Sequence, residues 1–299
     1  MSRVCLVILV LGAVLLPSGV ARAQDPPYVG WTQLLPGLTT QYEPTSENDC
    51  AAGRTRCIDA LIREMTRRFD RLADSCDHDS IFSLAYLRTT EEYRRTVEDP
   101  TFFEDTPFVN HEAAVFGEYY FRAYDAWHAG GSAPPAWAIA FDAAADRSVS
   151  ALGNVFLGMN AHIQRDLPFV FERIGMAKPD GSSRKPDHDR VNEFLNRVSD
   201  DLYPEVARRF DPTFDDFSVP GTTVDDFLSF QAIPAWRETA WRNAERLVAA
   251  QTPAERALVA QSIEEYAASQ ARTIRLATAY GPLQSSAARD AYCAVHHDD

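Results

Sequence analysis

The stretch SVSALGNVFLGMNAHIQRDLPFVF, residues 148–171, decides the fold, because no Asp, Glu, Lys or Arg occurs in the chain between Arg147 and Arg165. Its apolar side chains recur at steps of three and four residues, which is the period of a helix. Gly153 and Gly158 are small enough to let neighbouring helices pack closely. The pattern predicts a helix that is buried on most sides, at the centre of a helical bundle.

Two ionisable side chains interrupt this apolar stretch. His162 and Asp166 lie one turn apart on one face of the predicted helix. Such groups are costly in an apolar helix unless a partner or ligand compensates them. The H-x3-D step could bind one metal ion or pass a proton, so we take the pair as candidate catalytic residues and metal ligands. The alternative is a purely structural hydrogen-bonded pair beside a kink at Pro168.

The N-terminal residues 1–23 have the pattern of a cleaved signal peptide. Arg3 is followed by an apolar run over 4–16, and Ala21-Arg-Ala23 is a small-x-small cleavage site. We therefore expect a secreted or periplasmic protein. The apolar run is too short to span a bilayer, and no later segment is long and apolar enough, which predicts no stable membrane anchor.

The rest of the chain predicts an all-α protein. Residues 24–49 are rich in Pro, Gly and Thr, which favours an extended N-terminal arm, and residues 50–299 favour one helical domain. No stretch alternates as strands do, and no long period repeats. Helical runs are expected to begin near Ile58, Asp79, Asn110 (as a cap), Pro134, Ser148, Asp187 (as a cap), Val224, Pro234 and Thr252 (with a capping box).

Charge and cysteine content narrow the function classes. The formal net charge is −14, and it becomes more negative when Arg3 and Arg22 leave with the signal peptide, which argues against nucleic acid as a partner. Four cysteines remain after export, and an even number in an oxidising compartment favours pairing. Three connectivities are open, and we favour Cys50–Cys57 with Cys76–Cys293.

Polar and aromatic residues on the flanking helices could line a pocket beside the central pair. The candidates for binding a ligand are Tyr119, Asp189, Asn192, Arg237, Glu238 and Trp241. Arg237 and Glu238, next to Trp236 and Trp241, could form a buried ionic clamp. An arginine with two tryptophans nearby would suit an anionic or planar ligand through hydrogen bonds and stacking. An ordinary core salt bridge is the alternative. We expect no functional role for the remaining helical histidines: His78 as a capping or surface residue, His111 as an exposed first-turn residue, and His188 in a solvated charge run.

Several motifs of this sequence together resemble those of a bacterial family of unknown function, DUF5995. They are Cys76-x-His78-x3-Phe82-x3-Tyr86, the run from Phe108-Val-Asn110 through Tyr119-Tyr-Phe-Arg-Ala-Tyr124, Leu157-Gly-Met-Asn-Ala-His-Ile163 with Asp166-Leu-Pro168, Asp189-Arg-Val-Asn192 and Arg237-Glu-Thr-Ala-Trp241. The resemblance covers nearly all of the chain after the signal peptide. It implies a helical domain and brings no assigned activity.

A more distant resemblance is to zinc-dependent phospholipase C and P1-type nucleases, which are exported, all-helical and use an H-x3-D step as metal ligands. His162 and Asp166 match that step, which implies a divalent metal such as zinc. The chain departs from the pattern where Leu167-Pro-Phe169 replaces further histidines and where Gln24 replaces an N-terminal Trp. These departures leave room only for a one- or two-metal site.

Three hypotheses about function follow. The first is an exported metal-assisted hydrolase in which a bound cation activates water near His162 and Asp166. The second is a non-catalytic binding protein for a small apolar or anionic ligand, with a cavity walled by the aromatic helix 110–128 and by Trp236 and Trp241. The third is a polar centre that only fixes the register of the helices.

Overall fold

The chain folds as a helical bundle. The computed structural model describes residues 41–214, 232–281 and 285–298. Within these ranges it has ten α-helices, one π-helical segment and two isolated β-bridges, with no strand. The all-α prediction is therefore confirmed. The expected signal peptide, the arm up to residue 40 and the expected helix start at Val224 lie outside the described residues.

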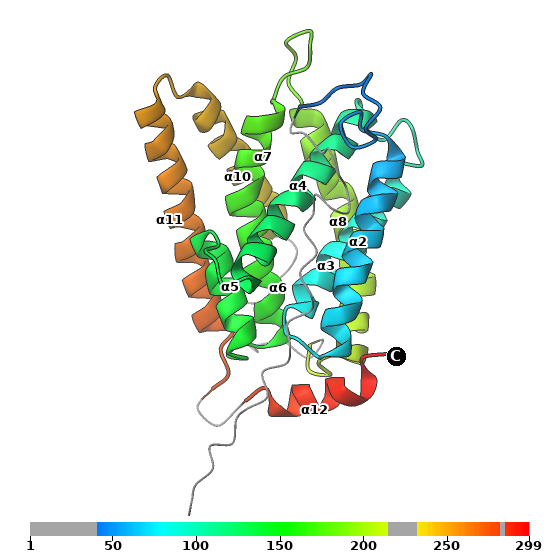
Figure 1. The fold of residues 1–299 in the computed structure, drawn as a ribbon, viewed down its shortest axis with the longest axis vertical. Coiled ribbons are helices and arrows are strands. Elements are labelled where there is room, and N and C mark those ends of the chain that lie inside the picture. The colour runs from blue at the N-terminus through cyan, green and yellow to red at the C-terminus, as the bar shows by residue number, and fades with distance from the viewer. Residues whose placement is uncertain (1–40, 215–231, 282–284, 299) are drawn as a thin grey trace, which may run out of the picture.

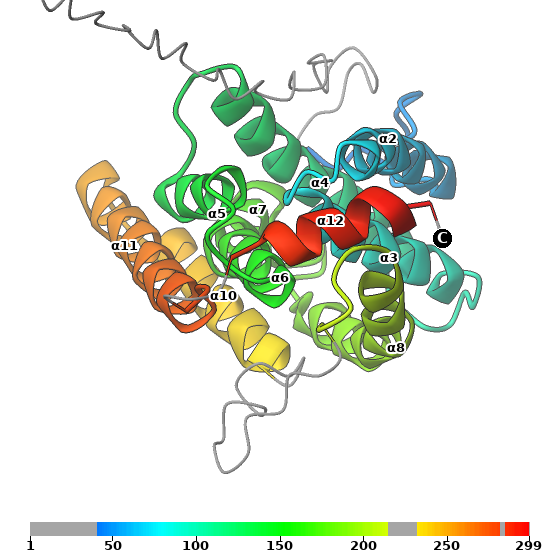
Figure 2. The same ribbon diagram turned by 90° about the horizontal axis from the view of Figure 1, so that it is seen from below.

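The helices follow the chain from α2 to α12 (Figures 1 and 2). Their bounds are α2 Thr55–Asp74, α3 Ser80–Thr96, α4 Thr106–His128, α5 Pro135–Ala145, α6 Ala151–Asn160, the π-helix η1 Ala161–Asp166, α7 Leu167–Ile174, α8 Lys185–Arg209, α10 Ala232–Ala249, α11 Pro253–Ala277 and α12 Ala287–His296. The longer helices run roughly along one axis, whereas α12 crosses one end of the bundle.

The central helix is α6, and it continues through η1 into α7. Every residue of α6 is buried, and this helix packs against α3, α5 and α11. Gly158 makes this close packing possible, because a Cβ atom there would lie only 2.2 Å from Cγ of Phe82 on α3. The predicted buried helix at the centre of the bundle is confirmed.

The central helix changes its winding before Pro168. Residues 161–166 form a π-helix, in which the Leu167 N–H donates to the carbonyl of His162. Pro168 has no N–H, so the carbonyl of Gln164 loses its α-helical donor. π-Helical segments are rare and occur frequently at functional sites. The wider turn therefore coincides with the two ionisable residues that the sequence singled out.

The start of α4 differs from the sequence-based expectation. Asn110 is not a cap: the helix begins before it, and Asp105 caps it by accepting a hydrogen bond from the Phe108 N–H at 3.2 Å. The Asn110 side chain is buried instead. It accepts from the Tyr93 hydroxyl at 2.6 Å and donates to the Gly53 carbonyl at 2.9 Å, so it joins three segments of the core. Likewise, α8 begins before Asp187, whose carboxylate accepts from backbone N–H groups just ahead of α4.

Both expected disulfides are present. Cys50–Cys57 closes a short loop at the start of α2, and Cys76–Cys293 joins the end of α2 to α12 across a sequence separation of 217 residues. Disulfides persist in oxidising compartments, so the two bonds fit an extracellular location. None of the helices in the described part of the chain is long and apolar enough to cross a membrane.

Candidate functional site

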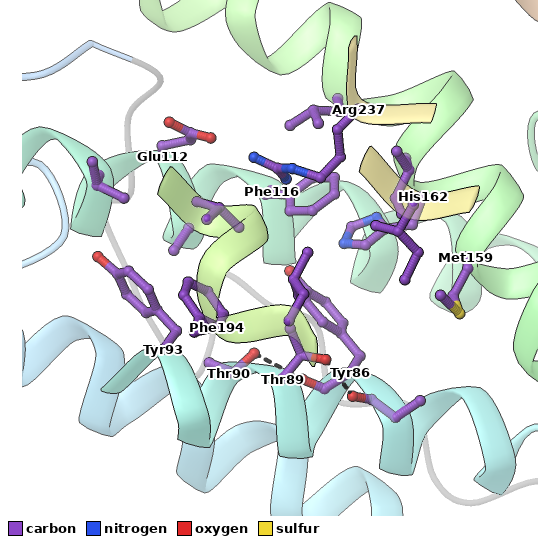
Figure 3. A pocket seen from close by; sticks show the side chains of 18 of the residues that line it. Tyr86, Thr89, Thr90, Tyr93, Glu112, Phe116, Met159, His162, Phe194 and Arg237 are labelled. Carbon is purple, nitrogen blue, oxygen red and sulfur yellow. Dashed lines mark hydrogen bonds between the residues drawn. The ribbon is translucent and has the colours of Figure 1, made fainter. Parts of the chain in front are cut away.

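An apolar cavity lies beside the central helix. Its volume is about 120 Å³, and its walls come from α3, α4, η1, α8 and α10, with single contributions from α6 and α7. Most of the lining side chains are aromatic or aliphatic, including Tyr86, Phe116, Met159 and Phe194 (Figure 3). A cavity of about this size that is lined by apolar side chains can hold a benzene-sized molecule.

The His162–Asp166 pair forms one polar feature beside this cavity. Asp166 is fully buried, and its carboxylate accepts hydrogen bonds from His162 Nδ1 at 3.1 Å, Trp137 Nε1 at 2.8 Å and Arg165 Nη1 at 2.9 Å. A carboxylate can only accept, so we assign the imidazole proton to Nδ1. Asp166 therefore orients the imidazole of His162, and the two residues are brought together as the sequence predicted.

The other ring nitrogen of His162 has no hydrogen-bond partner among the described residues. Nε2 is buried, and the ring stacks in parallel on Phe116 with centroids 3.4 Å apart, while Tyr86 packs edge-on at 4.5 Å. Burial lowers the pKa of His162 below its usual value, although Asp166 acts in the opposite direction. The imidazole is thus neutral at pH 7, and its Nε2 lone pair is left for a ligand.

These residues do not fit a zinc site. The Asp166 oxygens are already occupied by three donors, and the imidazole nitrogen nearest to them is part of the same network. In the described ranges, the grouping of side chains that could hold a metal ion is Asp74, His297 and Asp298, near the C-terminus. In the same described ranges, no third metal ligand lies beside His162 and Asp166. The H-x3-D step is therefore a hydrogen-bonded pair that lacks the ligands of a zinc site.

Arg237 provides the second polar feature of the cavity wall. The residue is only 6% exposed, and its Nη2 donates to His188 Nδ1 at 2.9 Å and to the His188 carbonyl at 2.7 Å. His188 Nε2 donates in return to the Arg237 carbonyl at 3.2 Å. The Arg237 Nε is buried with no partner among the described residues. Burial lowers the pKa of Arg237 to about 10, so it remains a cation at pH 7.

Glu112 is the carboxylic acid of the cavity wall, and the sequence did not single it out. It lies one turn before Phe116 on the face of α4 that lines the cavity (Figure 3). Burial raises the pKa of Glu112 to about 7, even though Arg237 acts to lower it. The signal that could have found Glu112 is its helical spacing from Val109 and Phe116, which places a carboxyl group within an apolar stripe.

Several expected binding residues lie away from the cavity. Asp189 is half-exposed and forms an ion pair with Lys185 at 2.7 Å. Glu238 pairs with the same lysine at 2.7 Å and with Arg242 at 2.8 Å. The expected clamp between Arg237 and Glu238 is not formed, because adjacent residues of a helix do not face each other.

The other three expected binding residues, Trp241, Tyr119 and Asn192, do not line the cavity either. Trp241 donates from Nε1 to Glu245 at 3.0 Å and packs against Phe171 and His188. Tyr119 lies under the guanidinium of Arg173. Asn192 has a buried Oδ1 with no partner in the described part of the chain, and it does not line the cavity.

The capping, surface or solvated positions expected for three histidines are wrong, because all three are buried. His78 bonds through Nε2 to Asp290 at 2.8 Å, and His111 bonds through Nδ1 to the Cys50 carbonyl at 2.9 Å. His188 pairs with Arg237 rather than lying in a solvated charge run. Each is satisfied by a residue distant in sequence, which local patterns do not reveal.

Fold and site together define an exclusively helical protein, as far as the structure describes it, with an apolar cavity and a few convergent polar groups. The chain belongs to the family of unknown function DUF5995, whose model matches residues 58–277. All of the cavity residues named above lie within that range. No curated protein and no solved structure matches the chain.

Proposed function

We propose that this protein binds a small, largely apolar molecule in the cavity beside the central helix. The observation that carries the proposal is the combination of apolar walls with buried polar atoms that lack a partner among the described residues. These atoms are Nε2 of His162 and Nε of Arg237. A buried polar group without a hydrogen-bond partner destabilises the folded state. Such a group is therefore expected where a bound ligand supplies the missing partner. Ligand sites commonly combine apolar walls with a few placed polar groups.

Binding of toluene tests this proposal directly. Toluene should raise the midpoint of thermal unfolding and shift the NMR signals of the Met159 and Ile163 methyl groups, because ligand binding stabilises the folded state. In the variant Ala113→Leu, a larger side chain would occupy the cavity, and both effects should disappear. Ala126→Leu on the same helix, away from the cavity lining, is the matched control and should keep both. The absence of binding to the unaltered protein would reject the proposal.

A second candidate function is hydrolysis, and the orientation of His162 by Asp166 favours it. A neutral imidazole whose Nδ1 is bonded to a carboxylate can accept a proton at Nε2, as a general base does. Small activated esters such as p-nitrophenyl acetate should then be hydrolysed faster than in buffer. His162→Gln should abolish the excess rate, whereas His296→Gln, a control for the reactivity of other histidines, should not. Equal rates in the unaltered protein and His162→Gln would reject catalysis while leaving binding intact.

We also propose that the chain is exported by cleavage after Ala23. The disulfide between α2 and α12 and the shorter one at Cys50 support this proposal, because such bonds form in oxidising compartments. The intact mass of the exported protein should correspond to a chain that begins at Gln24. Retention of residues 1–23 in the exported protein would contradict it.

A further inference from the structure

Arg237 is a buried cation without a carboxylate ion-pair partner among the described residues. The histidine that binds its Nη2 is neutral, because burial and Arg237 itself lower the pKa of His188 well below its usual value. A buried charge is costly unless it is paired. His188 therefore fixes the position of the guanidinium without neutralising it, and the Nε donor remains unused. The wall of the cavity thus presents a positioned positive charge that has no direct carboxylate partner among the described residues.

Glu112 lies on the same cavity wall and interacts electrostatically with Arg237, yet the two side chains form no ion pair. Figure 3 shows both side chains directed into one pocket from different helices, α4 and α10. With burial raising its pKa, Glu112 is readily protonated near neutral pH, and a protonated carboxyl group donates a hydrogen bond. The guanidinium of Arg237 and the protonated carboxyl group of Glu112 then each offer a hydrogen-bond donor at the same end of the cavity.

We propose that the ligand is a small monocarboxylate whose carboxylate group binds between Arg237 and Glu112 while its apolar body fills the cavity. The inference rests on the proposed function and adds the chemical class of the ligand. The charges balance in the complex, since the guanidinium cation meets one ligand anion and Glu112 is protonated there. Arginine suits this role because its planar donors match the geometry of a carboxylate.

Binding should take up a proton at Glu112. The groups that face this residue are Tyr86 and Tyr93 from α3, Asp187 of α8, Arg184 just before α8, and Arg237 from α10. The bound carboxylate adds a negative charge to this set, which favours the protonated form of Glu112 further. The affinity should therefore fall about tenfold for each unit of pH above 7, because an ionised Glu112 must be protonated before the anion binds.

Benzoate, benzamide and toluene are probes that test the inference, with affinities measured by calorimetry at several pH values. Benzoate should bind at pH 6.5 at least about tenfold more tightly than its neutral isostere benzamide, as expected for hydrogen bonds to charged groups. Arg237→Met should remove that preference and keep toluene binding. Arg242→Gln, which removes an exposed arginine from the same helix, should change neither affinity.

Glu112→Gln supplies a second test that does not depend on the folding of Arg237→Met. This variant keeps a donor without a titratable proton, so benzoate affinity should lose its pH dependence between pH 6.5 and 8.5. Equal affinity for benzoate and benzamide, or a preference that persists in Arg237→Met, would overturn the inference while toluene binding upheld the cavity. Failure of both toluene and benzoate to bind would reject the cavity function and the inference with it.

Discussion

Replacing Asp166 by alanine should destabilise the protein more than any other single loss of an acceptor in the central helix. The carboxylate is fully buried and accepts from Trp137, His162 and Arg165, which lie on two different helical segments. Alanine would leave the indole N–H and the imidazole N–H without an acceptor in the core. Arg165 would keep its ion pair with Glu264 at 2.7 Å, so its charge would remain compensated.

The size of the loss follows from these contacts. Each of the two buried donors left unsatisfied costs about 1–3 kcal/mol. We therefore expect the free energy of unfolding to fall by about 2–6 kcal/mol in Asp166→Ala. Asp166→Asn keeps one carbonyl acceptor at the same position, so about 1–3 kcal/mol should be lost.

Urea unfolding monitored by circular dichroism measures these differences, and Asp189→Ala is the matched control. Asp189 is half-exposed and pairs only with Lys185 in the described structure, so its loss should cost less than about 1 kcal/mol. Nitrogen NMR of His162 should show a protonated Nδ1 in the unaltered protein. A loss below about 1 kcal/mol in Asp166→Ala, or a proton on Nε2, would refute the assigned network.

Three further predictions concern the fold. Replacing Cys76 and Cys293 by alanine should cost about 5 kcal/mol of unfolding free energy in the chain-entropy account, against about 2 kcal/mol for the short disulfide, and equal losses in urea unfolding would contradict this. Gly158→Ala should cost about 1–3 kcal/mol by overpacking against Phe82, and a neutral effect on the unfolding midpoint would contradict the close packing. Stability should also fall as the pH drops below about 6.5, because burial lowers the pKa of three histidines, His78, His162 and His188. Each of these histidines binds a proton less readily in the folded chain than in the unfolded chain. The raised pKa of Glu112 acts in the opposite direction, so stability that rises as the pH falls from 6.5 to 5 would mean that the histidine contribution is absent.

The features that sequence patterns predicted are those that depend on local spacing. The uncharged run 148–164 predicted the central helix, and the period of the run from Ile58 to Ala73 predicted α2. The capping box at Thr252 is present at the start of α11. In each case the signal lies within one element, so no knowledge of the neighbouring helices was needed.

The parts of the site that were missed depend on contacts between distant residues. His188 stands between two aspartates, which suggests a solvated position, but 49 residues further on Arg237 covers it. Glu112 is a carboxyl group in the first turns of a helix, where such groups are usually exposed. Glu112 becomes part of a cavity wall because side chains from α3, α8 and α10 line the same cavity as this face of α4. Burial by a remote element leaves no local pattern.

The π-helix links the central helix to the function we propose. An uninterrupted α-helix through Pro168 would leave the Gln164 carbonyl without its donor inside the core. The wider turn of η1 redistributes these bonds, as the Leu167 N–H to His162 carbonyl bond shows. The same segment carries the imidazole that lines the cavity and the carboxylate that orients it. Pro168 could therefore serve to place this pair rather than to end a helix. In Pro168→Ala, a return of residues 161–166 to α-helical bonding, with altered toluene affinity, would support that role, whereas unchanged affinity would show that the site does not depend on the π-turn.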